Sequence, residues 1–207
     1  GSGFRCDKPT AFCAVKATSG HALHDSNEPL NPSRSYVYKN GRSFCEAITV
    51  TWQLRDVTDA DGGFACVPGS HKAQYRMPPG VRSCDDDMGL VVHPTFKAGD
   101  VLLFMDGAQT HGALAWHSDM ARRSILIKYS SRNFNRSGGD FAHPEARWGD
   151  VVEGMSDAQL SVMRGPDRDN HSGNVPRLDV AGDGDIQVLY ERSGGLYSGA
   201  TPDKPLA

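Results

Sequence analysis

The sequence predicts an all-β fold of the sandwich or jelly-roll class with one short helix near its C-terminal end. Short apolar runs recur along the chain and are separated by turn residues. The 207 residues include 23 glycines and 12 prolines, a content that favours many turns. One run alternates strictly between apolar and polar residues, and only one clear helix-start signal occurs. The length favours a single domain over residues 1–207.

The first part of the chain predicts strands divided by a long loop. An opening strand is expected within 4–17, and the stretch 20–35, which is rich in Pro, Asn and Ser, is expected to be loop. A short strand over 35–38 should end at the turn signal Asn40–Gly41.

The segment 43–54 carries the clearest strand pattern. Its apolar face consists of Ile48, Val50, Trp52 and Leu54. Its polar face consists of Thr49, Thr51 and Gln53. Because side chains alternate across a strand, one face should lie in a hydrophobic layer and the other should meet a polar cavity or water.

The remaining elements complete the sheets and add the helix. Further strands are expected at 63–68, 90–96, 101–105 and 125–129. Ser156 and Gln159 form a capping-box pattern, so a short helix should run from there to about Arg164. Residues 167–207 are expected to be an extended tail. We therefore expect a jelly-roll core over 4–135, with the C-terminal helix and tail, 136–207, packing on it.

Bulk properties exclude several classes of function. The net charge is −3 and no basic run occurs, which disfavours a nucleic-acid surface. No stretch of 18 apolar residues occurs, so no membrane partner is expected. Five cysteines without a Cys-x-x-Cys pair argue against a disulfide framework and a structural zinc site, and they favour a cytoplasmic location. A small-molecule substrate is the expected partner, and the sequence does not indicate an oligomeric state.

The segment 99–133 carries the strongest chemical signal. An apolar strand leads to His111–Gly112, and the pair Arg122–Arg123 opens the next strand. An imidazole can bind a transition metal, and a guanidinium eleven residues later can fork onto the carboxylate of a keto acid. Side chains alternate on a strand, so only one of the two arginines can face the cavity.

Two sequence blocks together resemble the phytanoyl-CoA dioxygenase family. The block 47–72 has a strand, an Asp-containing turn, Gly-Gly, a strand and Pro-Gly-Ser-His, and the block 99–133 follows it. The resemblance covers roughly 23–133. It implies a double-stranded β-helix (a jelly roll of cupin-like type) and an oxygenase that uses Fe(II), 2-oxoglutarate and O2, most simply to hydroxylate a small organic substrate.

The same resemblance assigns roles to individual residues. His111 corresponds to the distal metal ligand, and Arg122 is favoured over Arg123 as the residue that binds the keto acid. The polar face of the 43–54 strand would form the wall beside this co-substrate, where Thr49, Thr51 or Gln53 could donate hydrogen bonds to its carboxylate. The alternative for that face is an ordinary solvent-facing strand edge.

The proximal metal motif departs from the family pattern of His-x-Asp. His24 is the best match, but Asp25 follows it directly and Ser26 stands at the second position. A backbone bulge could bring Asp25 to the metal, or the carboxylate could come from Glu28 or Asp106. It could also be absent, as in halogenating members of the wider superfamily. The expected metal set is therefore His24, Asp25 and His111, with these alternatives open.

Two other functions compete with the oxygenase. One is a catalytically silent jelly roll that binds a ligand in the same cavity. The other is a metal enzyme that uses no keto acid or that acts as a halogenase. The one literal His-x-Asp, His117-Ser118-Asp119, follows His111 by only six residues, so we expect it to belong to a loop.

Overall fold

The computed structural model divides the chain into two compact units, Lys8–Tyr129 and residues 1–7 with 130–207. The structure describes residues 4–25, 28, 30–31, 34–73, 75–131, 134, 143–165 and 176–190. All five cysteines fall within these residues and are free thiols, which agrees with the absence of a disulfide framework.

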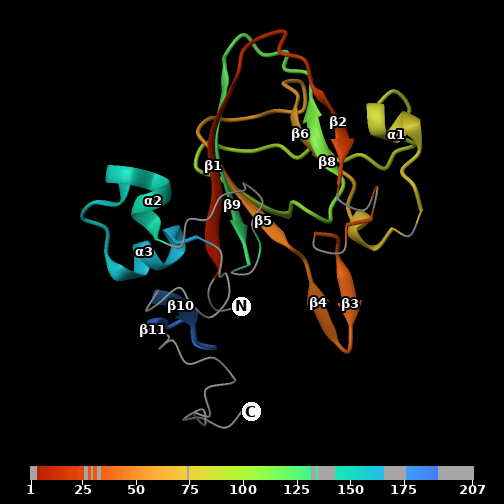
Figure 1. The fold of residues 1–207 in the computed structure, drawn as a ribbon. Coiled ribbons are helices and arrows are strands. Elements are labelled where there is room, and N and C mark those ends of the chain that lie inside the picture. The colour runs from red at the N-terminus through yellow and green to blue at the C-terminus, as the bar shows by residue number, and fades with distance from the viewer. Residues whose placement is uncertain are drawn as a thin grey trace. The chain divides into compact units, whose positions relative to one another are not determined.

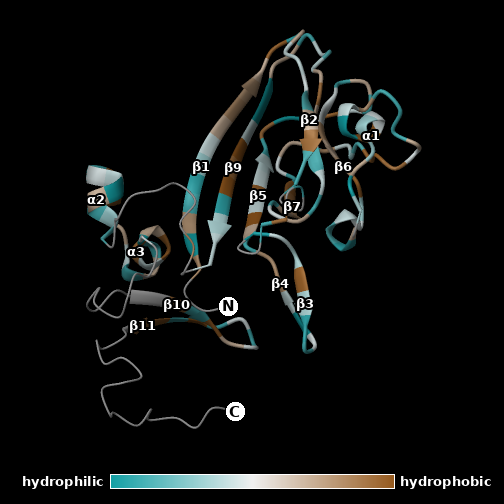
Figure 2. Ribbon diagram, turned by 45° about the vertical axis from the view of Figure 1, so that its right-hand side comes forward, coloured by the Kyte–Doolittle hydropathy of each residue, from teal (hydrophilic) through white to brown (hydrophobic). Residues whose placement is uncertain are grey.

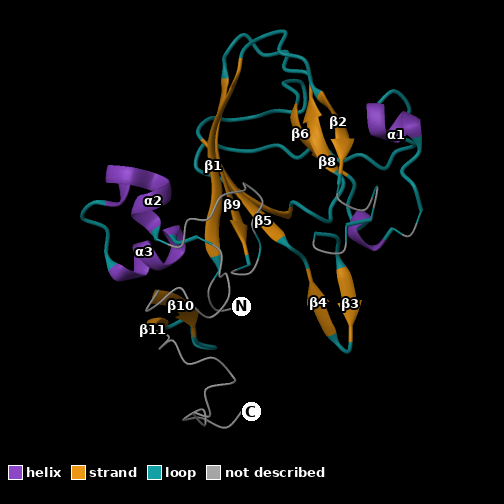
Figure 3. Ribbon diagram, in the orientation of Figure 1, coloured by secondary structure: helices purple, strands orange, loops and turns teal. Residues whose placement is uncertain are grey.

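Two sheets form the larger unit (Figures 1 and 3). The four-stranded sheet has the order β1-β9-β5-β7, with bounds Arg5–Ala14, Arg122–Ser130, Ala47–Gln53 and Val101–Met105. The three-stranded sheet has the order β2-β8-β6, with bounds His21–His24, His111–Leu114 and Gly63–Cys66. These sheets and the scarcity of helix confirm the predicted all-β jelly roll.

Short elements connect and extend the sheets. A hairpin of β3 (Val37–Lys39) and β4 (Arg42–Phe44) turns at Asn40–Gly41, and both turn residues have positive φ, of 53° and 73°. This geometry is that of the two-residue hairpin turn, so the turn prediction is confirmed. Between β6 and β7 lie the single-turn helix η1 (Ser70–Lys72) and α1 (Pro79–Ser83).

The strand β2 lies within the stretch that was expected to be loop. His21–His24 pairs antiparallel with β8, and the register shifts between the two histidines. The loop prediction is therefore wrong at 21–24. The error arises because this short strand is stabilised by pairing with a distant segment, which its own Pro- and Asn-rich surroundings do not indicate.

The strand β5 places its polar side chains inside and its apolar side chains outside. Thr49 and Gln53 are fully buried, whereas Ile48 is 46% exposed. The apolar outer face continues onto β7, where Leu103 is paired with Val50 and is itself exposed. Figure 2 shows these apolar segments in brown on β5, β7 and β9. The polar face therefore lines the interior of the jelly roll. A polar interior of this kind is expected where a polar ligand binds.

The smaller unit contains the remaining elements. They are α2 (Pro144–Trp148), η2 (Gly149–Val152), α3 (Asp157–Met163), β10 (Pro176–Val180) and β11 (Ile186–Tyr190). The predicted capping box begins α3, with Ser156 and Gln159 bonded reciprocally. The predicted extended tail includes the antiparallel hairpin β10–β11. No helix among the described residues is long and apolar enough to cross a membrane.

Candidate metal and keto-acid site

The two histidines of the predicted metal site lie side by side on neighbouring strands. His24 on β2 and His111 on β8 are direct partners in the antiparallel ladder, so their side chains share a face. Their ring centroids are 4.5 Å apart, with the planes tilted by 50°. The register shift before His24 is the kind of backbone irregularity that the sequence required for an adjacent carboxylate. The ladder therefore assembles two imidazoles from residues 87 positions apart.

Each of these imidazoles is oriented by a backbone carbonyl. Nδ1 of His111 donates to the oxygen of Gln109 at 2.7 Å, and Nδ1 of His24 donates to the oxygen of Ala22 at 3.3 Å. With the proton on Nδ1, Nε2 of each ring carries the free lone pair. Metal-binding histidines are commonly held in this way by a carbonyl on the other nitrogen.

Burial keeps both rings in the neutral form that a metal requires. Desolvation lowers the pKa of His111 to about 4, against a smaller opposing effect of its bond to Gln109. Desolvation also lowers the pKa of His24. The ring of His111 packs against Phe104, at 4.6 Å, and lies 6.3 Å from Phe64, which itself contacts Phe104. Both imidazoles are therefore deprotonated at neutral pH without a metal.

Three carboxylates were candidates for the third ligand, and each has a different environment. Glu28 accepts from Arg82 on α1 and from the backbone nitrogen of Met77, which commits both of its oxygens to structural contacts. Asp25 accepts from the hydroxyl of Thr110 at 2.6 Å. Asp25 follows His24 and Thr110 precedes His111, so this bond joins the residues next to the two histidines in the sequence.

The third carboxylate, Asp106, lies close to the ring of His111. Its Oδ1 is 3.6 Å from Nε2 of His111. The same oxygen accepts from Lys128 on β9 at 2.5 Å and from Thr49 on β5 at 3.1 Å. Asp106 is buried, and this ion pair with Lys128 compensates its charge.

The donor set fits a transition metal in part. Two neutral imidazoles with free Nε2 atoms and nearby carboxylates are the ligand types of a two-histidine, one-carboxylate iron site. Among the residues that the structure describes, no group of three His, Cys, Asp or Glu side chains is close enough to hold a metal as it stands. The histidine pair is therefore assembled, and the third ligand requires a side-chain movement. Ser26, which occupies the family's carboxylate position, lies outside the described residues.

The structure separates the two candidate arginines by burial. Arg122 is 6% exposed and Arg123 is exposed, as strand alternation requires. The guanidinium of Arg122 lies 5.0 Å from the ring centroid of Phe12, and desolvation lowers its pKa. Only Arg122 therefore remains a candidate for the keto-acid residue.

The glycine pair of the first sequence block makes room for this arginine and its strand. A Cβ on Gly62 would lie 1.8 Å from the backbone oxygen of Ala115, and one on Gly63 would lie 3.4 Å from Nε of Arg122. Both glycines also have positive φ, of 85° and 99°. The pair therefore allows β6 to approach the loop after β8 and leaves space beside Arg122.

The interior wall beside Arg122 holds polar atoms that have no hydrogen-bond partner among the described residues. They are Nε of Arg122, Oγ1 of Thr51, Oγ of Ser124 and both amide atoms of Gln53. All four side chains are buried and come from β5 or β9. A buried polar atom without a partner costs about 1–3 kcal/mol, so such a cluster indicates a site that a polar ligand completes. The dicarboxylate 2-oxoglutarate has the acceptors that this wall lacks.

Three residues of this arrangement were missed by the sequence analysis. Ser124 and Lys128 share the inward face of β9 with Arg122, and the period of two along the strand could have found them. Thr110 gave no signal, because its role depends on the pairing of β2 with β8. The literal His-x-Asp behaves as expected, since Asp119 is exposed and pairs with Lys16.

Comparisons with known proteins identify the same family that the two sequence blocks resemble. The model of the phytanoyl-CoA dioxygenase family matches residues 16–124. The solved structure of HygX from Streptomyces hygroscopicus with nickel and 2-oxoglutarate bound has a TM-score of 0.53 and 21% identity, over 64% of this chain and 60% of that one. HygX with iron bound gives a TM-score of 0.52 and 22% identity, over 64% and 59%.

At this identity the likeness to HygX shows a shared fold, and this chain spans about three fifths of the HygX chain. HygX has also been solved with nickel, 2-oxoglutarate and hygromycin B bound, at a TM-score of 0.51 and 21% identity, over 64% of this chain and 58% of that one. A search of curated proteins finds no match.

Proposed function

Because the chain belongs to the phytanoyl-CoA dioxygenase family, we propose that it is a non-haem Fe(II)- and 2-oxoglutarate-dependent oxygenase that hydroxylates a small organic substrate. The observation that carries the proposal is the pairing of two kinds of site in one interior. The oriented imidazoles of His24 and His111 offer ligands to the metal. The unpartnered wall around Arg122 offers donors to the keto acid.

The metal ligands would be His24, His111 and one carboxylate, for which we favour Asp25. The bond from Thr110 ties Asp25 to the residue before His111, and β2 has an irregular register between His21 and His24, which favours a local backbone distortion there. Asp106 is the alternative, because its Oδ1 lies 3.6 Å from Nε2 of His111. Its ion pair with Lys128 would have to open first, which makes it the less favoured ligand.

The protein's own residues would orient the co-substrate and exclude water. Arg122 would fork onto the far carboxylate of 2-oxoglutarate, and Thr51, Gln53 and Ser124 would complete its hydrogen bonds. The rings of Phe64 and Phe104 would cover His111 and keep water from that side. Bound Fe(II) would supply O2 activation coupled to decarboxylation of the keto acid, which is chemistry that amino-acid side chains lack.

An anaerobic titration of the metal-free protein with Fe(II) and 2-oxoglutarate tests the proposal. We expect the visible charge-transfer absorption of a keto acid chelated to ferrous iron, saturating at one equivalent. Iron binding without this absorption would favour a metal enzyme that uses no keto acid. Failure to bind iron would leave a jelly roll that binds a ligand without a metal.

Two carboxylate variants identify the third ligand. Asp25→Asn should weaken Fe(II) binding by about tenfold or more, in the range seen when groups around a metal site are removed, whereas Asp106→Asn should weaken it less. Asp119→Asn, which changes an exposed carboxylate, is the matched control. The reverse order of the first two variants would assign the ligand to Asp106.

A further inference from the structure

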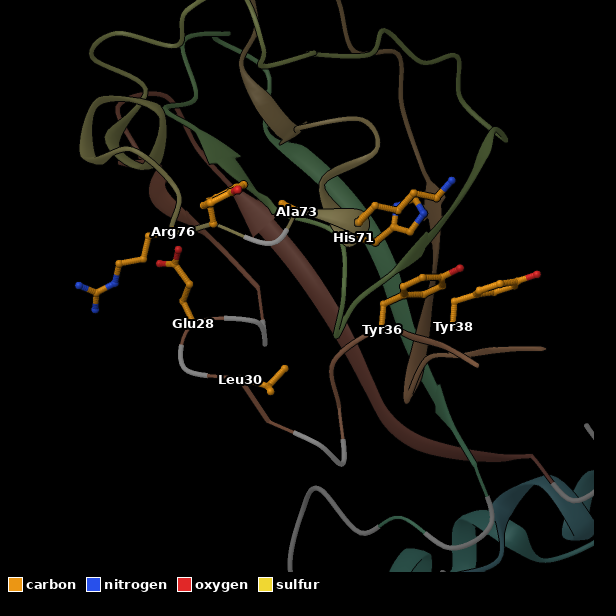
Figure 4. Close-up of a pocket in the computed structure, with 9 residues that line it drawn as sticks. Glu28, Leu30, Tyr36, Tyr38, His71, Ala73 and Arg76 are labelled. Carbon is orange, nitrogen blue, oxygen red and sulfur yellow. The ribbon is translucent and has the colours of Figure 1, made fainter. Parts of the chain in front are cut away.

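A large cavity, with a volume of about 880 Å³, is lined by residues between Glu28 and Arg76. This volume is within the usual range for small-molecule sites. Its walls come from the segment after β2, from β3 and from the segment around η1 (Figure 4). None of the proposed metal or keto-acid residues lines it, so it offers space for a third component.

One wall of this cavity consists of aromatic rings. Tyr36 and His71 meet edge to face with ring centroids 4.8 Å apart, and Tyr38 lies beside them (Figure 4). Tyr38 is 65% exposed and Leu30, which also lines the cavity, is 68% exposed. Apolar surface gathered in a concave site is typical of a surface that binds a ligand.

The rim of the cavity carries cations. Lys72 lies close enough to His71 to lower its pKa, after the larger effect of desolvation. Arg76 lies across the cavity beside Glu28, with its guanidinium directed outward (Figure 4). Neither Lys72 nor Arg76 forms an ion pair with a described residue, whereas Glu28 is neutralised by Arg82. The uncompensated charge at this rim is therefore positive.

A second, smaller cavity connects this site to the candidate metal centre. It has a volume of about 300 Å³ and shares Glu28, Ala73, Tyr75 and Arg76 with the large one. It is also lined by Asp25 and Thr110, which are next to His24 and His111 in the sequence. The rest of its lining is mainly apolar, from Val67, Met77, Pro78, Val81 and Leu90. The two cavities together thus offer cations and aromatic rings in the larger one and an apolar lining in the smaller one, with Arg76 in the wall that they share.

We propose that the substrate is a small amphiphilic organic anion. Its carboxylate or phosphate is held at the rim by Lys72 and Arg76, its body lies against Tyr36 and His71, and its apolar end occupies the smaller cavity. Only the site of reaction in this inference rests on the proposed function. If the protein is an oxygenase, the oxidised carbon lies at the end of the substrate remote from the anionic group. Binding itself depends on the two cavities alone.

A series of ligands with one body and different headgroups tests the proposal. The probes are 4-phenylbutyrate, 4-phenylbutyl phosphate, 4-phenylbutanol and 4-phenylbutylamine, titrated calorimetrically into the metal-free protein. Both anions should bind at least tenfold more tightly than the alcohol, and the amine should bind most weakly. The ratio of the two anions distinguishes a carboxylate from a phosphate site. An alcohol or amine that binds as tightly as the anions would overturn the proposal.

Variants assign the binding to this cavity. The double variant Lys72→Gln with Arg76→Gln should remove the preference for the anions and leave the affinity for the alcohol unchanged. Tyr36→Ala should weaken all four ligands. Lys39→Gln, which removes an exposed cation outside the cavity, is the control and should change nothing. Unchanged anion binding in the double variant would place the site elsewhere.

The outcome is separable from that of the proposed oxygenase function. If the anions bind but Fe(II) and 2-oxoglutarate give no charge-transfer absorption, the cavity is a ligand site and the oxygenase assignment fails. If the absorption forms but the anions do not bind, the oxygenase assignment stands and the substrate class is wrong.

Discussion

The two halves of the candidate site differ in how their polar groups are satisfied. At the metal half, His24, His111 and Asp106 all have hydrogen-bond partners within the chain. At the keto-acid half, buried atoms of Arg122, Thr51 and Gln53 have none among the described residues. Both halves face the same interior and share the strands β5 and β9.

This difference indicates two ways of preparing a binding site. The metal half is oriented in advance, because backbone carbonyls fix the imidazole tautomers before a metal arrives. The keto-acid half contains buried polar atoms without hydrogen-bond partners, and these atoms destabilise the ligand-free fold. A bound ligand would supply the missing partners and remove this destabilisation. Substitutions should therefore have opposite effects on stability in the two halves.

The largest effect is expected at His111. Replacing it with alanine removes a metal ligand, so His111→Ala should lower Fe(II) affinity by more than about 100-fold and abolish turnover. Equilibrium dialysis with Fe(II) and keto-acid decarboxylation assays measure the two effects, and circular dichroism checks that the fold is kept. Unchanged iron affinity would remove His111 from the metal site.

A smaller and more selective effect is expected at the arginine pair. Arg122→Ala should raise the concentration of 2-oxoglutarate required for half-saturation by about 10- to 100-fold, as loss of a charge-assisted bidentate contact predicts, and should leave iron affinity nearly unchanged. Arg123→Ala is the matched control on the exposed face of the same strand. If the control shows the loss instead, the register proposed for β9 is off by one residue.

The buried imidazole of His111 predicts a pH dependence for the metal-free protein. Its pKa is about 4 in the folded state, below the 6.5 of an exposed histidine, so protonation favours the unfolded chain. The stability it contributes is complete above pH 6.5, falls as the pH drops towards 4, and is lost below 4, by about 3 kcal/mol in total. Urea unfolding in the presence of chelator at pH 7 and pH 4.5 measures this loss. His111→Asn should lose less stability over that range, and an equal loss would show that other groups cause it.

The smallest effects, and the sharpest contrast, come from two threonines on β5. Thr49 and Thr51 are both buried on the same face, but Thr49 donates to Asp106 whereas Thr51 has no partner among the described residues. Thr49→Val should lower the free energy of unfolding by about 1–2 kcal/mol, whereas Thr51→Val should raise it by up to about 1 kcal/mol. Chemical denaturation of both variants without ligand measures the difference. Equal destabilisation by both variants would mean that the unpartnered hydroxyl of Thr51 does not lower the free energy of unfolding of the ligand-free protein.

Local patterns in the sequence predicted those parts of the site that depend on one strand. Alternation along 43–54 showed that Thr49, Thr51 and Gln53 share one face, and the spacing of His111 and Arg122 identified both as candidate site residues. Burial of Arg122 rather than Arg123 follows from the same period of two.

Features that depend on contacts between distant segments could not be predicted. The strand β2 is stabilised by pairing with β8, which lies far away in the sequence. Its own Pro- and Asn-rich surroundings predict a loop, so the local pattern did not indicate the strand. The ion pair of Asp106 with Lys128 joins two different strands, and the bond from Thr110 to Asp25 spans 85 residues. The exposure of the apolar outer face of β5 is likewise invisible to a pattern that shows only which side chains share a face.

The origin of the large cavity has a consequence for how this chain could change its substrate. Its walls are built by Glu28 and Leu30, by Tyr36 and Tyr38 and by the segment around η1, none of which is a metal or keto-acid residue in the proposed function. The spacing of His24 and His111 is set instead by the ladder of β2 and β8. Under the proposed function, specificity and reactivity would thus be encoded in separate stretches of sequence. Residues 30–38 and 71–76 could be varied in a library, by evolution or by an engineer, while the reactive centre is kept.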